Sequence, residues 1–245
     1  MVNNIPVYAH RGASAYVLEN SMEAFEKAIA LHADGIELDV QCSKEGTVFV
    51  YHDLNLKRLT GVDKFIHDCT DEELCNFRIG RRTFFRFIGN KRIPTFEKVL
   101  EWANKHNVKL NIELKESLID NLDPMIRLLK SQSLPKGSHV SSFHDVLLEK
   151  IKKECPHVET AIIVTRKFDW AALDAMKHID AVHAHKRYYK PRFLQICEKA
   201  KKPMRFYAID GKEAFLQRPH PVVAGWITDF PDRLAKKQPN RKKKV

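Results

Sequence analysis

Several common signatures are missing from this chain of 245 residues. No run of about 18 apolar residues occurs, so a membrane-spanning helix or stable membrane insertion is not expected. Residues 1–6 lack a basic segment followed by an apolar one, which argues against a secretory signal. The five cysteines are scattered and form no CxxC pair, which argues against a zinc site and a disulfide framework. These absences together favour a cytoplasmic protein.

Acidic residues are fewer than basic ones, so the net charge is +11. Part of the excess lies at residues 241–244, within a basic C-terminal tail that we expect over residues 236–245. Such a run is typical of a solvated tail, and it also attracts anionic lipid or nucleic acid. Aromatic residues are not interleaved with the basic ones as a stacking platform requires, so we expect no nucleic-acid partner. The charge favours anionic substrates in general.

Short apolar runs typical of strands alternate with amphipathic stretches typical of helices. Strands are predicted at residues 5–9, 35–40, 108–114, 139–143, 159–164, 181–184, 204–208 and 224–228. Helices are predicted at residues 21–31, 95–106, 122–130, 145–154, 169–177 and 191–200. Eight strand–helix repeats predict an α/β protein with a closed (β/α)8 TIM barrel. An open doubly wound sheet is disfavoured, since it rarely uses eight regular repeats at this length and no GxGxxG follows the first strand.

One long connection interrupts the repeats, between the second predicted strand and the helix that begins near Thr95. Turn residues at 43–46 predict a hairpin that pairs residues 47–51 back on the second strand. A short helix near residues 71–76 and a basic, aromatic loop at residues 81–92 follow. We therefore expect a single TIM-barrel domain over residues 1–235 with an insertion at about residues 43–93. An insertion on that face suits the shaping of a substrate pocket.

The start of the first predicted helix carries a local signal of its own. Asn20 is followed three residues later by Glu23, which predicts a capping box that opens the helix.

Chemically active side chains follow the ends of the first three predicted strands. His10 ends the first strand, Glu37 and Asp39 lie near the end of the second, and Glu113 ends the third. His52 follows the predicted hairpin. Because side chains alternate along a strand, Glu37 and Asp39 point to the same face. Active sites of these barrels are built at the C-terminal strand ends, so we expect all five side chains to meet there.

The three carboxylates predict a metal site. Burying them unpaired would be prohibitive, and a divalent cation removes their repulsion. Ligation by oxygen alone favours Mg²⁺ or Ca²⁺ over Zn²⁺. The alternative is a structural ion network in which the carboxylates pair with Arg11 and Lys115. That alternative is less favoured, because barrel interiors are usually filled with branched apolar side chains.

The histidines and cations complete a catalytic hypothesis. A lone histidine is usually a satisfied core residue, but His10 and His52 each stand beside a charged residue, Arg11 and Asp53 respectively. Imidazoles suit proton transfer, and Arg11 with Lys115 suits a bound phosphate. The set predicts metal-dependent cleavage of a phosphodiester. His183 and His185, at the sixth predicted strand, are weaker candidates for lining the pocket.

These residues belong to motifs that occur in order along essentially the whole chain and resemble the glycerophosphodiester phosphodiesterase family. The motifs are His10-Arg11-Gly12, Glu19-Asn20-Ser21, Ile36-Glu37-Leu38-Asp39-Val40, His52-Asp53, Arg58-x-Thr60, Ile93-Pro94-Thr95, Ile112-Glu113-Leu114-Lys115, Ser141-Ser142-Phe143 and Thr228-Asp229. Two segments depart from the family pattern, at residues 18–21 and 207–210. The second helps to define the pocket, so the preferred alcohol headgroup is left open.

The resemblance implies a TIM barrel that hydrolyses glycerophosphodiesters to sn-glycerol 3-phosphate and an alcohol, in lipid and glycerol metabolism. It also implies residue roles: metal ligation by Glu37, Asp39 and Glu113, acid–base catalysis by His10 and His52, and phosphate binding by Arg11 and Lys115. Water and the substrate's own 2-hydroxyl both stay open as the nucleophile. The oligomeric state is not predicted.

Three other functions are less favoured by the sequence. A lysophospholipase D would need an apolar surface for the acyl chain, for which Phe84, Phe85 and Phe87 of the insertion are candidates. A non-catalytic binder of phosphodiesters or anionic membranes has no need of two histidines and a metal cage. A nuclease ranks lower still, because no nucleic-acid-binding module is recognisable.

Overall fold

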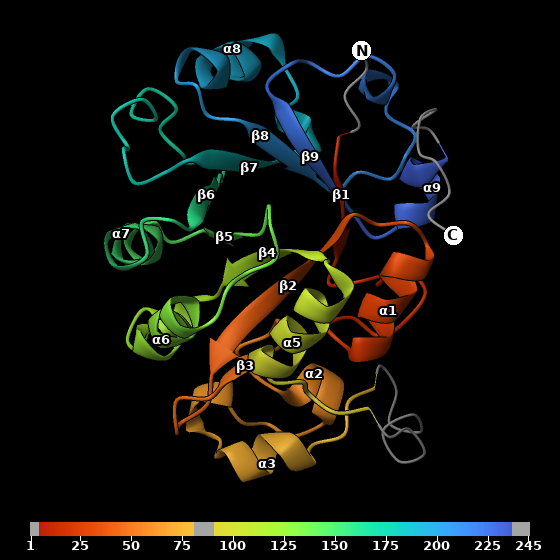
Figure 1. The fold of residues 1–245 in the computed structure, drawn as a ribbon, viewed down its shortest axis with the longest axis vertical. Helices are drawn as coiled ribbons and strands as arrows, with labels where there is room; N and C mark the ends of the chain where they lie inside the picture. The colour runs from red at the N-terminus through yellow and green to blue at the C-terminus, as the bar shows by residue number, and fades with distance from the viewer. Residues whose placement is uncertain (1–4, 81–90, 237–245) are drawn as a thin grey trace.

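A computed structural model describes residues 5–80 and 91–236 of the chain, and its centre is a closed barrel of parallel strands (Figure 1). The barrel strands are β1 (Val7–His10), β2 (Gly35–Cys42), β4 (Lys109–Leu114), β5 (His139–Ser142), β6 (Glu159–Ile163), β7 (Ala181–His185), β8 (Met204–Tyr207) and β9 (Val223–Thr228). Their order is β1-β9-β8-β7-β6-β5-β4-β2, and the pairing of β1 with β2 closes the ring. The predicted TIM barrel is confirmed.

Helices surround the barrel (Figure 1). They are α1 (Met22–Ala30), α5 (Phe96–His106), α6 (Asp123–Ser131), α7 (Asp145–Glu154), α8 (Pro191–Lys199) and α9 (Pro231–Ala235). Among the described residues, the connection from β8 to β9 contains only the 3₁₀ turn η4 (Ala214–Leu216). Two further 3₁₀ turns, η2 (Glu116–Leu118) and η3 (Lys186–Tyr188), follow β4 and β7.

One predicted helix, at residues 169–177, is wrong, because that segment consists of turns. The Asp169 side chain accepts a hydrogen bond from the Ala171 backbone N–H at 2.9 Å, which competes with helical pairing. Of residues 169–177 only Leu173 is buried, and Trp170 and Met176 pack against the core with part of each side chain exposed.

The predicted capping box at the start of α1 is also wrong by one residue. Ser21 is the N-cap, and its hydroxyl accepts a hydrogen bond from the Ala24 N–H at 3.2 Å. Asn20 has a left-handed backbone with φ 53°, and its amide instead donates to Asp39 at 2.8 Å. The predicted start of α5 is confirmed, with Thr95 as its N-cap.

The connection after β2 begins with the predicted hairpin. Strand β3 (Val48–Val50) runs antiparallel to the end of β2, and Val40 pairs with Val50. Helix α2 (Lys57–Thr60), turn η1 (Ile66–Asp68) and helix α3 (Asp71–Asn76) follow, and α3 coincides with the predicted short helix. A separate apolar cluster supports this segment, formed mainly by Leu18, Phe49, Tyr51, Leu56, Leu59, Ile66, Leu74 and Ile93. Residues 81–90, with Phe84, Phe85 and Phe87, lie outside the described residues.

The main apolar core lies between the strands and the helices. Ile36, Leu38 and Val40 of β2 belong to this core, together with Phe25 of α1 and Leu100 of α5. This confirms the predicted alternation, which leaves the intervening Glu37 and Asp39 to face the inside of the barrel.

Polar side chains fill much of the barrel interior. The His139 ring contacts Tyr8 and His183 edge to face, with ring centroids 5.4 and 5.1 Å away. Arg205 forms an ion pair with Glu159 at 2.6 Å. The expectation of a mainly branched apolar interior was therefore wrong for this barrel. His139 and His183 are fully buried, and burial with the positive charge of Arg205 lowers the pKa of each well below its usual value, so both are neutral.

Candidate active site

Three carboxylates meet on the neighbouring strands β2 and β4, where Glu113 is the residue before the last of β4. One oxygen each from Glu37, Asp39 and Glu113 lies within 4.8 Å of the others. The register of the two strands, which pairs Asp39 with Glu113, produces this arrangement. Glu37 Oε1 and Asp39 Oδ1 are buried and have no hydrogen-bond partner among the described residues. Buried acceptors without partners are costly, so the group fits a cation.

The electrostatics of these carboxylates agree with that conclusion. Burial, followed by the neighbouring Asp39 charge, raises the pKa of Glu37 to about 8. The same two causes raise the pKa of Glu113. Without a cation, the protein therefore resists ionising all of them together.

Two cations border the acidic group. The Arg11 guanidinium lies 2.8 Å from Glu19 and 3.3 Å from Asp39. The Lys115 ammonium lies 2.8 Å from Glu113 and 3.6 Å from Asp39. These are the contacts that a structural ion network would have. They nevertheless leave Glu37 Oε1 without a hydrogen bond or an ion pair among the described residues, whereas Asp39 Oδ1 has only the Lys115 contact at 3.6 Å.

Each predicted catalytic histidine is held by an aspartate. His10 Nδ1 lies 2.7 Å from Asp229, and His52 Nδ1 lies 2.7 Å from Asp53. An aspartate on Nδ1 fixes the ring orientation and leaves Nε2 for a substrate. Burial lowers the pKa of His10, but Glu37 and Asp229 outweigh it and raise that pKa to about 9.

Sequence reasoning assigned these partners only in part. Asp53 was named beside His52, whereas the partner of His10 is Asp229, from the far end of the chain, and not Arg11. Thr228-Asp229 had been noted as a motif, so a polar residue at the end of the last strand was the available signal.

An outer layer of charges connects the two sides of the site. Arg58 donates to Asp53 at 2.5 Å and to Glu19 at 2.8 Å, and Arg11 also donates to Glu19 at 2.8 Å. The chain of contacts therefore runs from His52 through Asp53, Arg58 and Glu19 to Arg11. Glu19 and Arg58 had appeared in the sequence only as motif members without a role.

This layer predicts a component of acid stability. Burial raises the pKa of Glu19, but hydrogen bonds from Arg58 and Arg11 outweigh it and lower that pKa to about 2. A lowered carboxyl pKa stabilises the fold fully above about pH 4.5, and the stabilisation is lost as pH falls toward 2. Glu19→Gln should therefore cost about 2–3 kcal/mol of unfolding free energy at pH 7 and progressively less below pH 4.5. Urea unfolding of both proteins across this range measures the difference, and a pH-independent difference would contradict the assignment.

A left-handed turn after β1 places Arg11 against Glu37. Arg11 and Gly12 have φ values of 55° and 79°, and the Arg11 N–H donates to Glu37 at 2.8 Å. A Cβ on Gly12 would lie 2.7 Å from the backbone carbon of Ala24, closer than packing allows. A glycine is therefore required here by both backbone and space.

This turn gives a prediction with a matched control. Gly46 has a similar φ of 88°, but a Cβ there would meet only Pro124, at 3.4 Å. We expect Gly46→Ala to cost about 1–2 kcal/mol, from the left-handed backbone alone. Gly12→Ala should cost clearly more, because the backbone of α1 must also move. If urea unfolding shows that both variants lose the same free energy of unfolding, the contact between the new Cβ and Ala24 carries no cost of its own.

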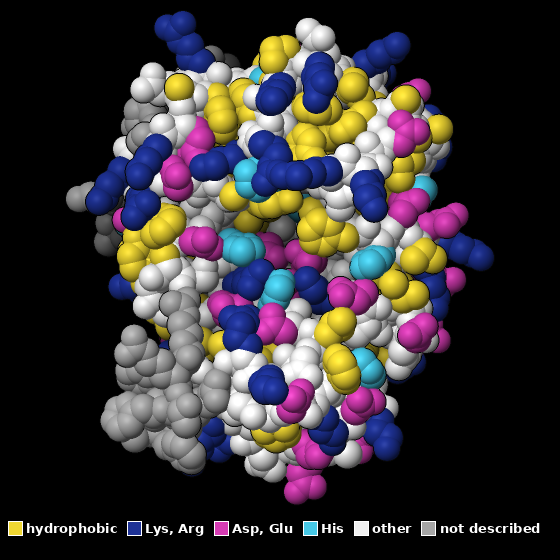
Figure 2. Space-filling model, turned by 180° about the vertical axis from the view of Figure 1, so that it is seen from behind, with side chains coloured by type: hydrophobic (Ala, Val, Ile, Leu, Met, Phe, Trp, Pro, Cys, Tyr) yellow, Lys and Arg dark blue, Asp and Glu magenta, His cyan; other side chains and the backbone are white. Residues whose placement is uncertain are grey.

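A hollow of about 330 Å³ opens beside the site, lined by His10, Arg11, Ser14, Ala15, Glu19, Asp229 and Phe230. Figure 2 shows histidine and acidic side chains around a central hollow on this side of the molecule. His185, ring to ring with Tyr207, is half-buried, and it is absent from the lining of this hollow. His183 is 1% exposed inside the barrel, so its predicted place in the pocket lining is wrong.

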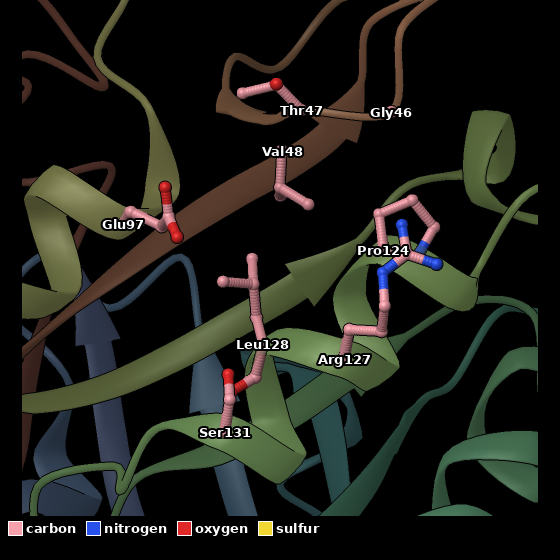
Figure 3. A pocket seen from close by; sticks show the side chains of 8 residues that line it. All are labelled: Gly46, Thr47, Val48, Glu97, Pro124, Arg127, Leu128 and Ser131. Carbon is pink, nitrogen blue, oxygen red and sulfur yellow. The ribbon is translucent and has the colours of Figure 1, made fainter.

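A second hollow, of about 300 Å³, lies between the β2–β3 hairpin and helices α5 and α6 (Figure 3). Glu97 and Arg127 come to it from opposite sides, with Val48 and Leu128 between them. It contains no histidine and only one carboxylate, whereas the first hollow is lined by His10, Glu19 and Asp229.

Comparisons with known proteins identify the family of this chain. Residues 10–233 match the model of the glycerophosphoryl diester phosphodiesterase family. A glycerophosphodiester phosphodiesterase of Caldanaerobacter subterraneus is 32% identical over 93% of this chain and 95% of its own length. A phosphodiesterase of Oleispira antarctica, solved with its product sn-glycerol-3-phosphate, superposes with a TM-score of 0.82 at 22% identity, over 95% of this chain and 96% of the other. A lysophospholipase D of Rattus norvegicus is 30% identical over 60% of this chain and 48% of its own length.

The fold and the site define a TIM-barrel phosphodiesterase. The chain belongs to the glycerophosphoryl diester phosphodiesterase family, and the predicted enzyme class, a phosphoric diester hydrolase, is confirmed at that level. Within the described ranges, no helix combines the length and apolar character needed to span a bilayer.

Proposed function

We propose that this protein hydrolyses glycerophosphodiesters to sn-glycerol 3-phosphate and an alcohol. The observation that carries the proposal is the joint geometry of the site: two histidines, each oriented by an aspartate, beside a buried group of three carboxylates. The similarity to a named glycerophosphodiester phosphodiesterase over nearly the whole chain supports the same reaction.

Glu37, Asp39 and Glu113 would hold a divalent cation. The donor set consists of oxygen alone, which suits Mg²⁺ or Ca²⁺, and Glu37 Oε1 and Asp39 Oδ1 accept no hydrogen bond among the described residues and are available to bind it. When bound, such an ion supplies positive charge that offsets the charge of the phosphodiester in the transition state.

Arg11 and Lys115 would bind the phosphate oxygens. Both lie at the edge of the carboxylate group, and their side chains are 19% and 10% exposed. A largely buried cation interacts with an anion more strongly than a fully solvated one does.

His10 and His52 would move the protons. With Nδ1 of each ring bonded to an aspartate, Nε2 of one removes a proton from the nucleophile and Nε2 of the other gives a proton to the leaving alkoxide. Water and the substrate's 2-hydroxyl are both compatible with these groups as the nucleophile.

The identity of the products tests this proposal. Glycerophosphocholine, glycerophosphoethanolamine and glycerophosphoglycerol are incubated with the protein and either Mg²⁺ or Ca²⁺. Glycerol 3-phosphate and the free alcohol are expected. Release of glycerol with phosphocholine would show cleavage of the other ester bond and contradict the proposed binding orientation. No release from any of the three would overturn the proposed reaction.

A lysophospholipase D activity is the second candidate, and the similarity to the rat enzyme of that name supports it. Hydrolysis of lysophosphatidylcholine at a rate above that of glycerophosphocholine would favour it. A cytoplasmic location and a part in lipid and glycerol metabolism remain predictions.

A further inference from the structure

A cluster of aromatic side chains lies on the loops that follow β6 and β7 and on the first turn of helix α8. Trp170 packs against Phe168, Tyr188 and Phe193 with ring centroids 5.3, 5.7 and 4.5 Å away. Phe168, Trp170 and Tyr188 are only partly buried. The cluster borders a groove of about 520 Å³ lined by Arg166, Trp170, Tyr188, Arg192, Phe193 and Ile196. Trp170 and Tyr188 pack against the core and still present part of their surface to the groove.

Basic side chains surround this cluster. Arg166, Lys167, Arg187, Lys190 and Arg192 are all exposed. In the described part of the chain, none of them forms an ion pair with a carboxylate, although Asp169 lies in the same loop. The Arg192 guanidinium lies over the Phe193 ring at 4.3 Å from its centroid. We call these five basic residues and four rings the aromatic–basic patch.

The aromatic–basic patch lies on the same side of the barrel as the candidate active site. Both of its loops leave the C-terminal ends of barrel strands, as do the residues that follow β1 and β2. Figure 2 shows basic and hydrophobic side chains gathered beside the central hollow of histidine and acidic side chains. A surface bound to the patch would therefore face the active site.

We propose that the aromatic–basic patch docks the active-site side of the protein on an anionic phospholipid bilayer. Aromatic rings with a polar edge favour the depth of the lipid headgroups, and arginine and lysine bind the lipid phosphates there. The five basic residues form no ion pair with a carboxylate in the described part of the chain, so their positive charge complements an anionic surface. This docking does not depend on which glycerophosphodiester the enzyme cleaves.

A bilayer fits this patch better than a single-stranded nucleic acid. Base stacking needs an open aromatic face. Here Trp170, Tyr188 and Phe193 pack on one another, and Arg192 covers part of the Phe193 ring. The rings present edges and a shared apolar surface rather than separate faces.

Vesicle sedimentation of the full chain tests the proposal. We expect binding to vesicles of phosphatidylcholine mixed with phosphatidylserine, weak binding to phosphatidylcholine alone, and release at high salt. The double variant Arg166→Gln/Arg192→Gln should lose at least about tenfold in affinity, since each basic residue near an anionic surface contributes about fivefold. The matched control, Lys105→Gln/Lys153→Gln, removes two exposed charges from α5 and α7 and should bind like the unchanged protein.

The basic tail at residues 241–244 is the competing source of attraction. A variant with glutamine at these four positions should retain patch-dependent binding. If the tail variant loses all binding while the double arginine variant keeps it, the proposal is wrong. The proposal is also wrong if the Lys105→Gln/Lys153→Gln control loses as much vesicle affinity as the patch variant, because net charge alone would then explain the binding.

Insertion of the rings gives a second readout. Trp170 fluorescence should shift to shorter wavelength on anionic vesicles and be quenched by brominated acyl chains, and Trp170→Phe should remove this signal. Trp226 is 2% exposed, and Trp102 lies on α5 against Phe25, so neither should respond. Absence of quenching from Trp170 would contradict docking through the patch. If the patch binds a single-stranded oligonucleotide and no vesicles, its ligand is a nucleic acid and the proposed lipid docking is wrong.

The patch variants also separate this proposal from the proposed reaction. None of these residues belongs to the candidate active site, so hydrolysis of soluble glycerophosphocholine should be unchanged in all of them. Loss of vesicle binding with normal hydrolysis supports docking. An inactive wild-type protein that still binds vesicles through the patch would overturn the reaction and leave the docking intact.

Discussion

Replacing His52 or His10 by alanine should lower kcat for glycerophosphodiester hydrolysis by about 10²–10⁴-fold each. Each Nδ1 lies 2.7 Å from an aspartate, so each ring is oriented for proton transfer through Nε2. Both imidazoles are about one-third exposed, so their removal should leave folding intact. Steady-state rates under saturating substrate and metal measure the effect.

A third histidine provides the matched control. His144 follows β5 at the same end of the barrel and is 36% exposed, similar to His10, but its nearest carboxylate, Glu116, is 3.9 Å away. His144→Ala should keep the wild-type rate. If a His10 or His52 variant also keeps most of its rate, that histidine has no part in proton transfer.

Glu37→Gln should remove both the response to metal and the activity. In the unchanged protein, a divalent cation at 100 times its Kd should raise the free energy of unfolding by about 2.7 kcal/mol. The variant lacks one of the three charged ligands and should show little or no such increase. Thermal unfolding with Mg²⁺, Ca²⁺ or a chelator measures this directly, without reference to turnover.

Without metal, the unchanged protein should have no advantage over Glu37→Gln in free energy of unfolding. Burial and Asp39 raise the pKa of Glu37 to about 8, so its ionised form destabilises the folded state. A raised carboxyl pKa gives stability that decreases as pH rises from about 4.5 toward 8. Without metal at pH 7, Glu37→Gln should therefore be at least as stable as the unchanged protein.

Glu116→Gln, which removes a half-exposed carboxylate just after β4, should change neither the metal response nor the activity. A metal response retained by Glu37→Gln would exclude that residue as a ligand.

The barrel and the three carboxylates were predictable because each depends on a local pattern. Alternation along a strand is sufficient to separate Glu37 and Asp39 from Ile36 and Leu38. Short apolar runs are sufficient to locate the strands, and the largest shift is in the first, predicted at residues 5–9 and observed at Val7–His10. The turns at residues 169–177 were missed because amphipathic spacing alone does not reveal that an aspartate side chain competes for the backbone.

Contacts between distant segments were harder to predict. The pairing of His10 with Asp229 depends on closure of the barrel between β1 and β9, which brings together residues 219 positions apart. Asn20 looked like a helix cap, yet its left-handed backbone turns its amide toward Asp39. The polar barrel interior was unexpected because alternation predicts which side chains point inward, but not whether Arg205 will find Glu159 there.

Metal-dependent release of glycerol 3-phosphate is the most direct test of the central claim that the carboxylate group and the two histidines form one active site. Metal-stripped protein is titrated with Mg²⁺ or Ca²⁺, and product release from glycerophosphocholine is followed for the unchanged protein, Glu37→Gln and His52→Ala. The account predicts saturable activation of the unchanged protein, loss of activation in Glu37→Gln, and a full metal response in thermal unfolding but little turnover in His52→Ala. Full activity of the stripped protein in chelator would contradict it.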